Sequence, residues 1–187
     1  MTEQGYDLIK RFEGFRSEWY QDVAGVWTIG YGTTTRLPGF TRSSVEEPID
    51  ELTADTWLRY AVQHIFEPGI KEILAEPLVN EEQLTALVSL AYNVGIPALK
   101  GSDLMRHIKA GRMNRAAAEF DRWVYAYDKE LGRKRVDKGL ARRRAIEREL
   151  FEEGTVNEQH IEDLQPVPIR DVEPLPPEGL TPITEIE

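Results

Sequence analysis

The feature that most limits the fold of this chain is a short apolar stripe that ends at a glycine and passes at once into an alternating segment. The apolar residues of 8–12 recur with helical spacing, and Gly14 is a natural helix stop. Large and small residues then alternate over 26–31, as they do in a strand. One face of this strand is expected to be open, and Gly30 and Gly32 weaken a strand but allow close approach of a ligand or another backbone. The sequence therefore predicts a short helix joined directly to a β-hairpin.

Two carboxylates and a hydroxyl lie on these adjoining elements. Glu13 ends the predicted helix, Asp22 lies on the first arm of the hairpin, and Thr28 lies on the second. Glycoside hydrolysis uses such a set, because one acid protonates the leaving oxygen while a second carboxylate acts on the opposite face of the sugar. Taken singly, each residue has an ordinary structural alternative: an exposed helix glutamate, a turn-capping aspartate and a strand-forming threonine.

Three motifs follow one another along the chain. In the first, Asp22 comes nine residues after Glu13, and Thr28 a further six residues on, within T-I-G-x-G. The other two are Q-L-T-A-L-V-S-L-A-Y-N-V-G at 83–95, and W-V-Y at 123–125 with G-L-A-R-R-R-A-I-E-R-E-L-F at 139–151. With these motifs in this order, the chain resembles the phage-type lysozymes, or endolysins, of glycoside hydrolase family 24. The resemblance runs from about residue 5 to about residue 153.

This resemblance implies an α+β, mainly helical fold with two lobes. A small lobe of helix plus β-hairpin would join a larger helical lobe, with a cleft between them. The implied activity is that of a muramidase, which cleaves the β-1,4 bond between N-acetylmuramic acid and N-acetylglucosamine in bacterial peptidoglycan. Glu13 would be the general acid, Asp22 the second catalytic carboxylate, and Thr28 the residue that helps to orient the attacking water. No cofactor is implied.

Other residues take expected roles from the same resemblance. Tyr31, Tyr92 and Asn93 are expected to contact the saccharide, although packing at a helix end is an equal alternative for the last two. Thr33 stands where family members usually have histidine, which leaves open how the catalytic glutamate is supported. In the run 142–144, one arginine is expected to be buried and ion-paired in the helical lobe, while a solvated helix face is the ordinary alternative.

The remaining elements are predicted from caps and periodicity. Residues 36–52 contain Pro-Gly and Ser-Ser pairs and are interpreted as a loop. Thr53 with Asp55 is expected to cap the helix that follows. The first predicted helix covers 54–66, and Pro68 opens a second segment that ends near Leu74. A third helix starts at a capping box of Asn80 and Gln83 and ends at Gly95. Three further helices are predicted near 98–109, 114–125 and 139–152.

The last part of the chain differs in composition from the rest. Residues 154–187 hold six of the eleven prolines, and residues 152–187 hold ten acids and one base. Such a segment cannot bury enough apolar surface to fold alone and is expected to be extended, in part as polyproline II. The prediction is therefore a catalytic domain over 1–153 and an acidic, proline-rich tail over 154–187. Apolar residues interspersed in the tail indicate a docking segment, for a phage structural protein or for the basic stretch 129–148.

Composition excludes several classes of protein. The chain has no cysteine, and its three histidines, His64, His107 and His160, have no paired spacing, so no metal site is predicted. No apolar run is long enough to span a membrane, and no signal pattern opens the sequence. Nucleic-acid binding is not expected, because the basic stripe is short and no aromatic platform accompanies it.

Two interpretations of the biology stay open at this point. In the first, the protein is made in the host cytoplasm and acts on the wall after a holin opens the membrane, causing lysis. In the second, it is a virion-associated, tail or baseplate component that docks through residues 154–187. The catalytic reaction is the same in both interpretations, which differ only in where the protein is found.

Overall fold

The computed structural model describes residues 1–22, 25–37, 39–128 and 132–153. Helix α1 (Glu3–Glu13) is capped by the side chain of Thr2 at its start and by Gly14 at its end. Strands β1 (Arg16–Gln21), β2 (Trp27–Gly30) and β3 (Thr33–Thr34) follow at once and form an antiparallel sheet in the order β1-β2-β3. The predicted helix-plus-hairpin lobe is therefore confirmed, with a short third strand that the sequence did not indicate.

The side of β2 on which Gly30 lies is covered by α2, although the sequence predicted a strand with one open face. A Cβ placed on Gly30 would lie 3.0 Å from the Cβ of Ala54, because α2 packs against the strand there. Thr28, on the same face, is only 4% exposed. The glycine at position 30 thus permits close approach of a helix rather than of a ligand.

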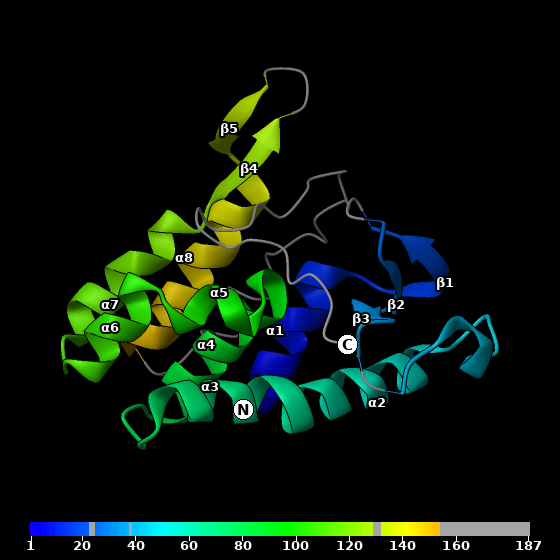
Figure 1. Ribbon diagram of the computed structural model, residues 1–187, viewed down its shortest axis with the longest axis horizontal. Helices are drawn as coiled ribbons and strands as arrows, with labels where there is room; N and C mark the ends of the chain where they lie inside the picture. Colours follow the sequence, from blue (N-terminus) through cyan, green and yellow to red (C-terminus); the bar gives the residue numbers. More distant parts are fainter. Residues whose placement is uncertain (23–24, 38, 129–131, 154–187) are drawn as a thin grey trace, which may run out of the picture.

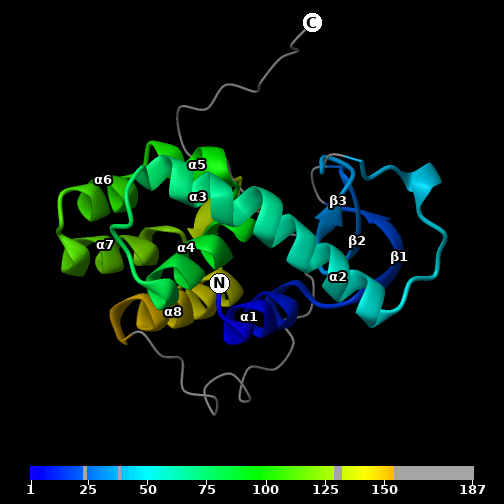
Figure 2. The same cartoon turned by 90° about the horizontal axis from the view of Figure 1, so that it is seen from below.

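A long, nearly continuous helix joins the two lobes. Helix α2 (Glu51–Ala61) passes through a π-helical turn, η2 (Val62–Phe66), into α3 (Glu67–Leu74), and Figure 2 shows this helix running from the sheet to the helical lobe. Asp50 is the N-cap, because its carboxylate accepts a hydrogen bond from the backbone N–H of Thr53. The predicted cap by Thr53 and Asp55 is therefore wrong, and the helix starts three residues earlier than expected.

The loop before this helix packs on the small lobe. It contains one turn of 3₁₀ helix, η1 (Arg42–Ser44). The guanidinium of Arg42 lies 3.9 Å from the centre of the Trp27 ring, and the rings of Phe40 and Trp57 meet edge to face. These contacts fasten the loop to β2 and to α2.

The helical lobe is built around α4 (Glu81–Val94). Its first turn has the predicted capping box of Asn80 and Gln83, and Gly95 ends it. Every residue from Leu84 to Ala91 is buried, so α4 is the central helix of the lobe (Figure 1). The surrounding elements are α5 (Ile96–Lys100), α6 (Asp103–Lys109), α7 (Met113–Glu119), η3 (Phe120–Arg122) and α8 (Lys138–Glu153).

Two of the predicted helices have different bounds in the structure. The helix expected near 98–109 is two helices, because Ser102 caps α6 and separates it from α5. The helix expected over 114–125 gives way to η3 and then to a strand at Tyr125. Helix α8 agrees with its prediction of 139–152 to within one residue at each end.

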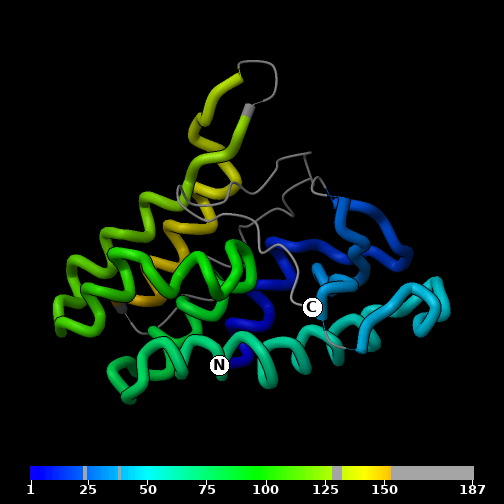
Figure 3. Tube along the Cα trace, viewed as in Figure 1, coloured from blue at the N-terminus to red at the C-terminus, as the bar shows by residue number. Residues whose placement is uncertain are grey.

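A second hairpin was not predicted. Strands β4 (Tyr125–Asp128) and β5 (Arg133–Val136) pair antiparallel, and Figures 1 and 3 show them projecting from the helical lobe beside the start of α8. The face that carries Tyr125, Tyr127 and Val136 is exposed. Residues 154–187, predicted to be an extended tail, lie outside the described residues.

No helix in the described ranges is both long and apolar enough to cross a membrane.

Candidate active site

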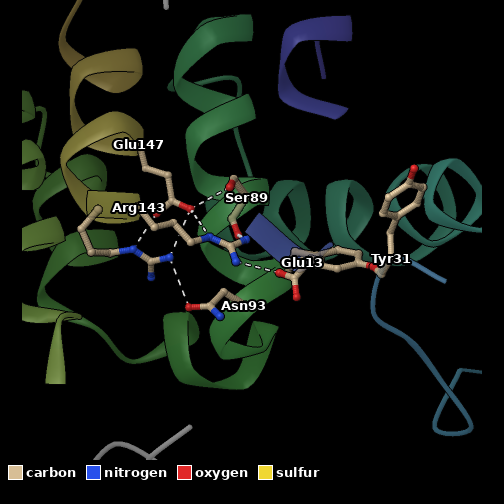
Figure 4. A network of polar contacts seen from close by, with 8 residues as sticks. Glu13, Tyr31, Ser89, Asn93, Arg143 and Glu147 are labelled. Atoms are coloured by element: carbon tan, nitrogen blue, oxygen red, sulfur yellow. Dashed lines mark hydrogen bonds and ion pairs between the residues drawn. The ribbon is translucent and has the colours of Figure 1, made fainter. Parts of the chain in front are cut away.

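Glu13 is held where the small lobe meets the helical lobe. It is the last residue of α1, and its side chain is 22% exposed. Its Oε1 accepts a hydrogen bond of 2.7 Å from Nη1 of Arg143 on α8, drawn in Figure 4. One carboxylate oxygen is thus fixed by a buried guanidinium, while the side chain as a whole keeps partial access to solvent.

The second oxygen of Glu13 faces the turn between β2 and β3. A Cβ placed on Gly32 would lie 3.4 Å from Oε2 of Glu13 and 3.3 Å from the ring of Tyr92. Gly32 has a φ of +86°, which side chains other than glycine rarely adopt. The backbone conformation therefore favours glycine here, and a side chain would crowd the ring of Tyr92 and touch the carboxylate of Glu13.

Tyr92, from α4, closes another side of this site. Its hydroxyl donates a hydrogen bond of 2.6 Å to the carbonyl oxygen of Tyr31. Burial raises the pKa of Tyr92 far above its ordinary value, and the nearby negative charge of Glu13 raises it further. The phenol therefore stays protonated and acts as a fixed link between α4 and the β2–β3 turn.

Asp22 and Thr28 belong to the β1–β2 hairpin. Thr28 pairs with Tyr20 across the strands, so these two side chains point to the same side of the sheet, and Asp22 follows the end of β1 at Gln21. Oδ1 of Asp22 accepts a hydrogen bond of 2.8 Å from the N–H of Val26. The carbonyl of Val26 in turn accepts from the N–H of Asp22 at 2.9 Å and from Oγ1 of Thr28 at 3.1 Å. Asp22 is thus a turn cap, as the structural alternative proposed, and it is bound to Thr28 through one peptide group.

The charges of both carboxylates act on Tyr20 of β1. Burial raises its pKa, and the negative charges of Glu13 and Asp22 raise it further against the opposing charge of Arg16. The phenol of Tyr20 therefore stays protonated.

Behind Glu13 lies a buried polar network, drawn in Figure 4. Glu147 is fully buried between two arginines of its own helix and Ser89 of α4. Arg144 is also fully buried and donates a hydrogen bond of 3.2 Å to Oδ1 of Asn93. Burial lowers the pKa of Arg144 to about 10, against the attraction of Glu147.

The predicted saccharide-contact residues have partners within the protein. The side chain of Tyr31 is 7% exposed, its hydroxyl donates to Oε2 of Glu51 at 3.2 Å, and Figure 4 shows its ring turned away from Glu13. Asn93 is half-buried and bonded to Arg144, and Tyr92 is bonded to Tyr31. Contact of these three residues with a sugar stays a prediction. Thr33, in the place of the usual histidine, is fully buried in β3.

Four residues at the site were not singled out from the sequence for this role: Tyr20, Gly32, Arg143 and Glu147. The buried arginine expected in the run 142–144 is in fact a pair, Arg143 and Arg144, and the first of them contacts the catalytic candidate. The spacing of Arg143 and Glu147 by four residues on one helix was a usable signal, since such residues share a face. Nothing local in the sequence indicated Tyr20.

Within the described ranges, no group of three or more histidine, cysteine or acidic side chains gathers as metal ligands would. The site is made of carboxylates, hydroxyls and the buried guanidinium groups of Arg143 and Arg144. A partly exposed glutamate with one oxygen fixed, followed by a hairpin that carries an aspartate and a threonine, suits acid-assisted attack by water.

Comparison with known proteins gives the same indication. Residues 10–147 match the family profile described as phage lysozyme. The chain is 33% identical to an endolysin of Acyrthosiphon pisum secondary endosymbiont phage 1, over 81% of this chain and 97% of that protein. It is 39% identical to an endolysin of Bacillus phage B103 over 81% of this chain, and there it spans only 53% of the relative's length.

A solved structure agrees in fold as well as in sequence. The muramidase domain of SpmX from Asticaccaulis excentricus superposes with a TM-score of 0.69 at 34% identity, covering 80% of this chain and 95% of that domain. The predicted α+β, lysozyme-like architecture is confirmed by this similarity.

Proposed function

The chain belongs to the phage lysozyme family, and we propose that it hydrolyses the β-1,4 bond between N-acetylmuramic acid and N-acetylglucosamine of bacterial peptidoglycan. The observation that carries this proposal is the position of Glu13. Its carboxylate ends α1 and is fixed at one oxygen by Arg143, and the hairpin that follows at once holds Asp22 and Thr28 through hydrogen bonds to Val26. Family membership makes the chain a glycoside hydrolase, and this arrangement supports the choice of acid.

Glu13 protonates the bridging oxygen in the proposed reaction. Because Arg143 donates to Oε1, the proton is expected on Oε2, which faces the β2–β3 turn. The absence of a side chain at Gly32 keeps that oxygen accessible. As the bond to the leaving sugar breaks, positive charge develops at the anomeric carbon and in the ring.

Asp22 and Thr28 act on the opposite face of the sugar. The carboxylate of Asp22 stabilises the developing positive charge and accepts a proton from the attacking water. The hydroxyl of Thr28 donates to the carbonyl of Val26, so its oxygen is oriented to accept a hydrogen bond from that water. The backbone N–H of Val26 holds Asp22 and its carbonyl holds Thr28, so both side chains are fixed in one turn and the water is held at a defined position.

We propose that the biological setting is lysis of a bacterial host by a phage, since relatives at 33% and 39% identity are named endolysins. In that setting the protein acts on the cell wall, after release from the cytoplasm by a holin. A virion-borne lysozyme that docks on a phage structural protein through residues 154–187 would use the same residues. No contact among the described residues favours that second setting.

The test is digestion of purified peptidoglycan, followed by reduction of the new sugar ends with borohydride and mass spectrometry of the fragments. Cleavage of the proposed bond produces fragments that end in reduced muramic acid. Fragments ending in reduced glucosamine would assign the other glycosidic bond, and 1,6-anhydro ends would show intramolecular attack in place of water. Mass spectrometry of purified phage particles separates the free protein from a virion-borne one.

A further inference from the structure

We propose that Glu147 is a positioning residue for this reaction: it holds Arg143 in the orientation from which Arg143 contacts Glu13. The inference rests on the proposed function, because it assigns Glu13 as the acid. Glu147 itself is fully buried, and its hydrogen bonds are to Ser89, Arg143 and Arg144. Its effect on the reaction therefore passes through Arg143.

The guanidinium of Arg143 is held at three points. Its Nε donates a hydrogen bond of 3.0 Å to Oε1 of Glu147. Its Nη2 donates one of 3.0 Å to the carbonyl oxygen of Ser89, and its Nη1 makes the 2.7 Å contact with Glu13. Since the guanidinium is planar, fixing Nε and Nη2 on the buried side determines the direction in which Nη1 points.

Glu147 is itself fixed by contacts from two helices. Its Oε1 accepts a hydrogen bond of 2.7 Å from the hydroxyl of Ser89 and one of 3.2 Å from Nη2 of Arg144. Its Oε2 forms an ion pair of 2.8 Å with Nε of Arg144. A carboxylate with this many charged and polar partners has one orientation, so the chain of contacts from α4 to Glu13 is rigid.

Charge gives Glu147 a second effect on the acid. Burial lowers the pKa of Arg143, but the neighbouring carboxylates of Glu13 and Glu147 more than offset this and raise it overall. Both carboxylates form ion pairs with Arg143, at 2.7 Å for Glu13 and 3.0 Å for Glu147. With Glu147 present, the positive charge of Arg143 is shared between them. Without it, the positive charges of Arg143 and Arg144 both act on Glu13 and favour its carboxylate form, which cannot donate a proton.

The other groups around these residues do not replace that charge. The groups that interact electrostatically with Glu13 include the phenols of Tyr20 from β1 and Tyr92 from α4, and the guanidinium groups of Arg143 and Arg144 from α8. Both phenols have raised pKa values and stay neutral in the working range. Around Glu147 the remaining groups are Arg143, Arg144 and Ser89, which add no negative charge.

The experiment compares Glu147→Gln with a matched control on the same helix. Glutamine keeps the shape and an acceptor oxygen but removes the charge. Ile146→Ala is the control, because Ile146 is buried beside Glu147 in the chain and its truncation destabilises the lobe without touching an arginine. Glu147→Asp keeps the negative charge on a side chain that is one methylene shorter, so it separates the effect of charge from that of side-chain length. Rates of reducing-end release are measured from pH 4 to 9, well below the melting temperature of each variant.

The expected result is a change in the pH profile that only the uncharged variant shows. In Glu147→Gln the alkaline limb of the kcat profile moves to lower pH by about one unit, and KM changes little. Glu147→Asp and Ile146→Ala keep the wild-type limb, whatever their stability. A Glu147→Gln profile that coincides with wild type, or an Ile146→Ala profile with the same displacement, would overturn the proposal.

A readout independent of activity completes the test. Hydrogen exchange at Nε of Arg143, followed by NMR of the guanidinium, should be at least tenfold faster in Glu147→Gln than in wild type or Ile146→Ala. Equal exchange in all three proteins would show that Glu147 does not hold Arg143. If the wild type releases no reducing ends, the proposed function fails, and the exchange comparison still decides whether Glu147 positions Arg143.

Discussion

Arg143 donates a hydrogen bond of 2.7 Å from Nη1 to Oε1 of Glu13, across 130 positions of the sequence. This single contact joins the end of the first helix to the last described helix and thereby ties the acid to the helical lobe. Because Arg143 is 3% exposed and Glu13 is partly exposed, the contact runs from the protein interior to the edge of the site.

Glu13→Gln should abolish hydrolysis of peptidoglycan while the protein stays folded. An amide can still accept the hydrogen bond from Arg143, but it cannot donate a proton to a leaving oxygen. Loss of general acid catalysis costs about 10²–10⁴ in rate. Reducing-end release is the measurement, with circular dichroism as the check on folding. Activity within tenfold of wild type would remove Glu13 from the acid role.

Gly32→Ala should impair catalysis more than stability. The new Cβ would meet Oε2 of Glu13 at 3.4 Å and Tyr92 at 3.3 Å. Gly111→Ala is the matched control, since Gly111 also has a positive φ, +67°, but nothing within 4 Å of its Cβ. Both changes should cost about 1–2 kcal/mol through backbone strain. Only Gly32→Ala should reduce kcat tenfold or more, and equal rates in the two variants would refute the crowding argument.

The reaction should proceed with inversion at the anomeric carbon. Carboxylates about 6.5–9.5 Å apart leave room for a water, while about 5–5.5 Å leads to a covalent intermediate. Placement of the two acids on a helix end and on a hairpin turn, with Thr28 to hold a water, favours the wider separation. Proton NMR of a defined glycan substrate should show the α-anomer as the first product. A glycosyl adduct trapped on Asp22 would contradict this expectation.

Local patterns were sufficient for much of the fold. The stop at Gly14, the capping box at Asn80 and the length of α8 were all predicted from neighbouring residues, and the structure confirms them. The hairpin of β4 and β5 was missed because each strand has only four residues and three of the four in β5 are cationic. Asp50 was overlooked as a cap, since Thr53 and Asp55 nearby are equally good capping types.

The site was only partly predictable for a different reason. The residues Glu13, Asp22 and Thr28 belong to one continuous stretch, so their spacing carried the signal. Arg143 comes from the far end of the described chain, and its spacing of four residues from Glu147 shows that the two share a face of α8 but not that this face is buried. Once α8 is known to pack on α4, the choice of arginine follows, because only two of the three at 142–144 lie on the buried face with Glu147.

Asp55→Asn should destabilise the protein at neutral pH and have less effect in acid. Burial raises the pKa of Asp55, but hydrogen bonds from Arg59 and Lys10 outweigh it and hold the pKa below its ordinary value. A depressed pKa adds stability above the ordinary value of about 3.9, and that stability is lost as pH falls through the folded-state value. The cost at pH 7 should be about 0.5–1 kcal/mol, after allowance for solvent screening.

Thermal melting from pH 7 down to pH 3 measures this effect. The gap in melting temperature between wild type and Asp55→Asn should be a few degrees at pH 7 and should narrow below about pH 4. Asp7→Asn is the control, because Asp7 also pairs with Lys10, at 2.9 Å, but is 59% exposed. A gap that stays constant with pH would show that the ion pairs do not account for the effect.

Truncation after residue 153 should leave both stability and hydrolysis close to those of the full chain. Residues 154–187 hold six of the eleven prolines and eight of the acids with a single base, Arg170, so they lack the apolar content of a core. Helix α8 already supplies the buried residues Ile146, Leu150 and Phe151 before that point. A truncated protein that melts at a much lower temperature would place the tail within the domain.

The tail should instead affect association. Its acids and interspersed apolar residues suit an extended segment that binds a basic surface, and strand β5 offers exposed Arg133, Lys134 and Arg135. A synthetic peptide of residues 154–187 added to the truncated protein should bind at low salt and dissociate as ionic strength rises, since exposed charges are screened over about 8 Å at physiological salt. If the peptide does not bind at low salt, the tail acts on a partner other than this chain.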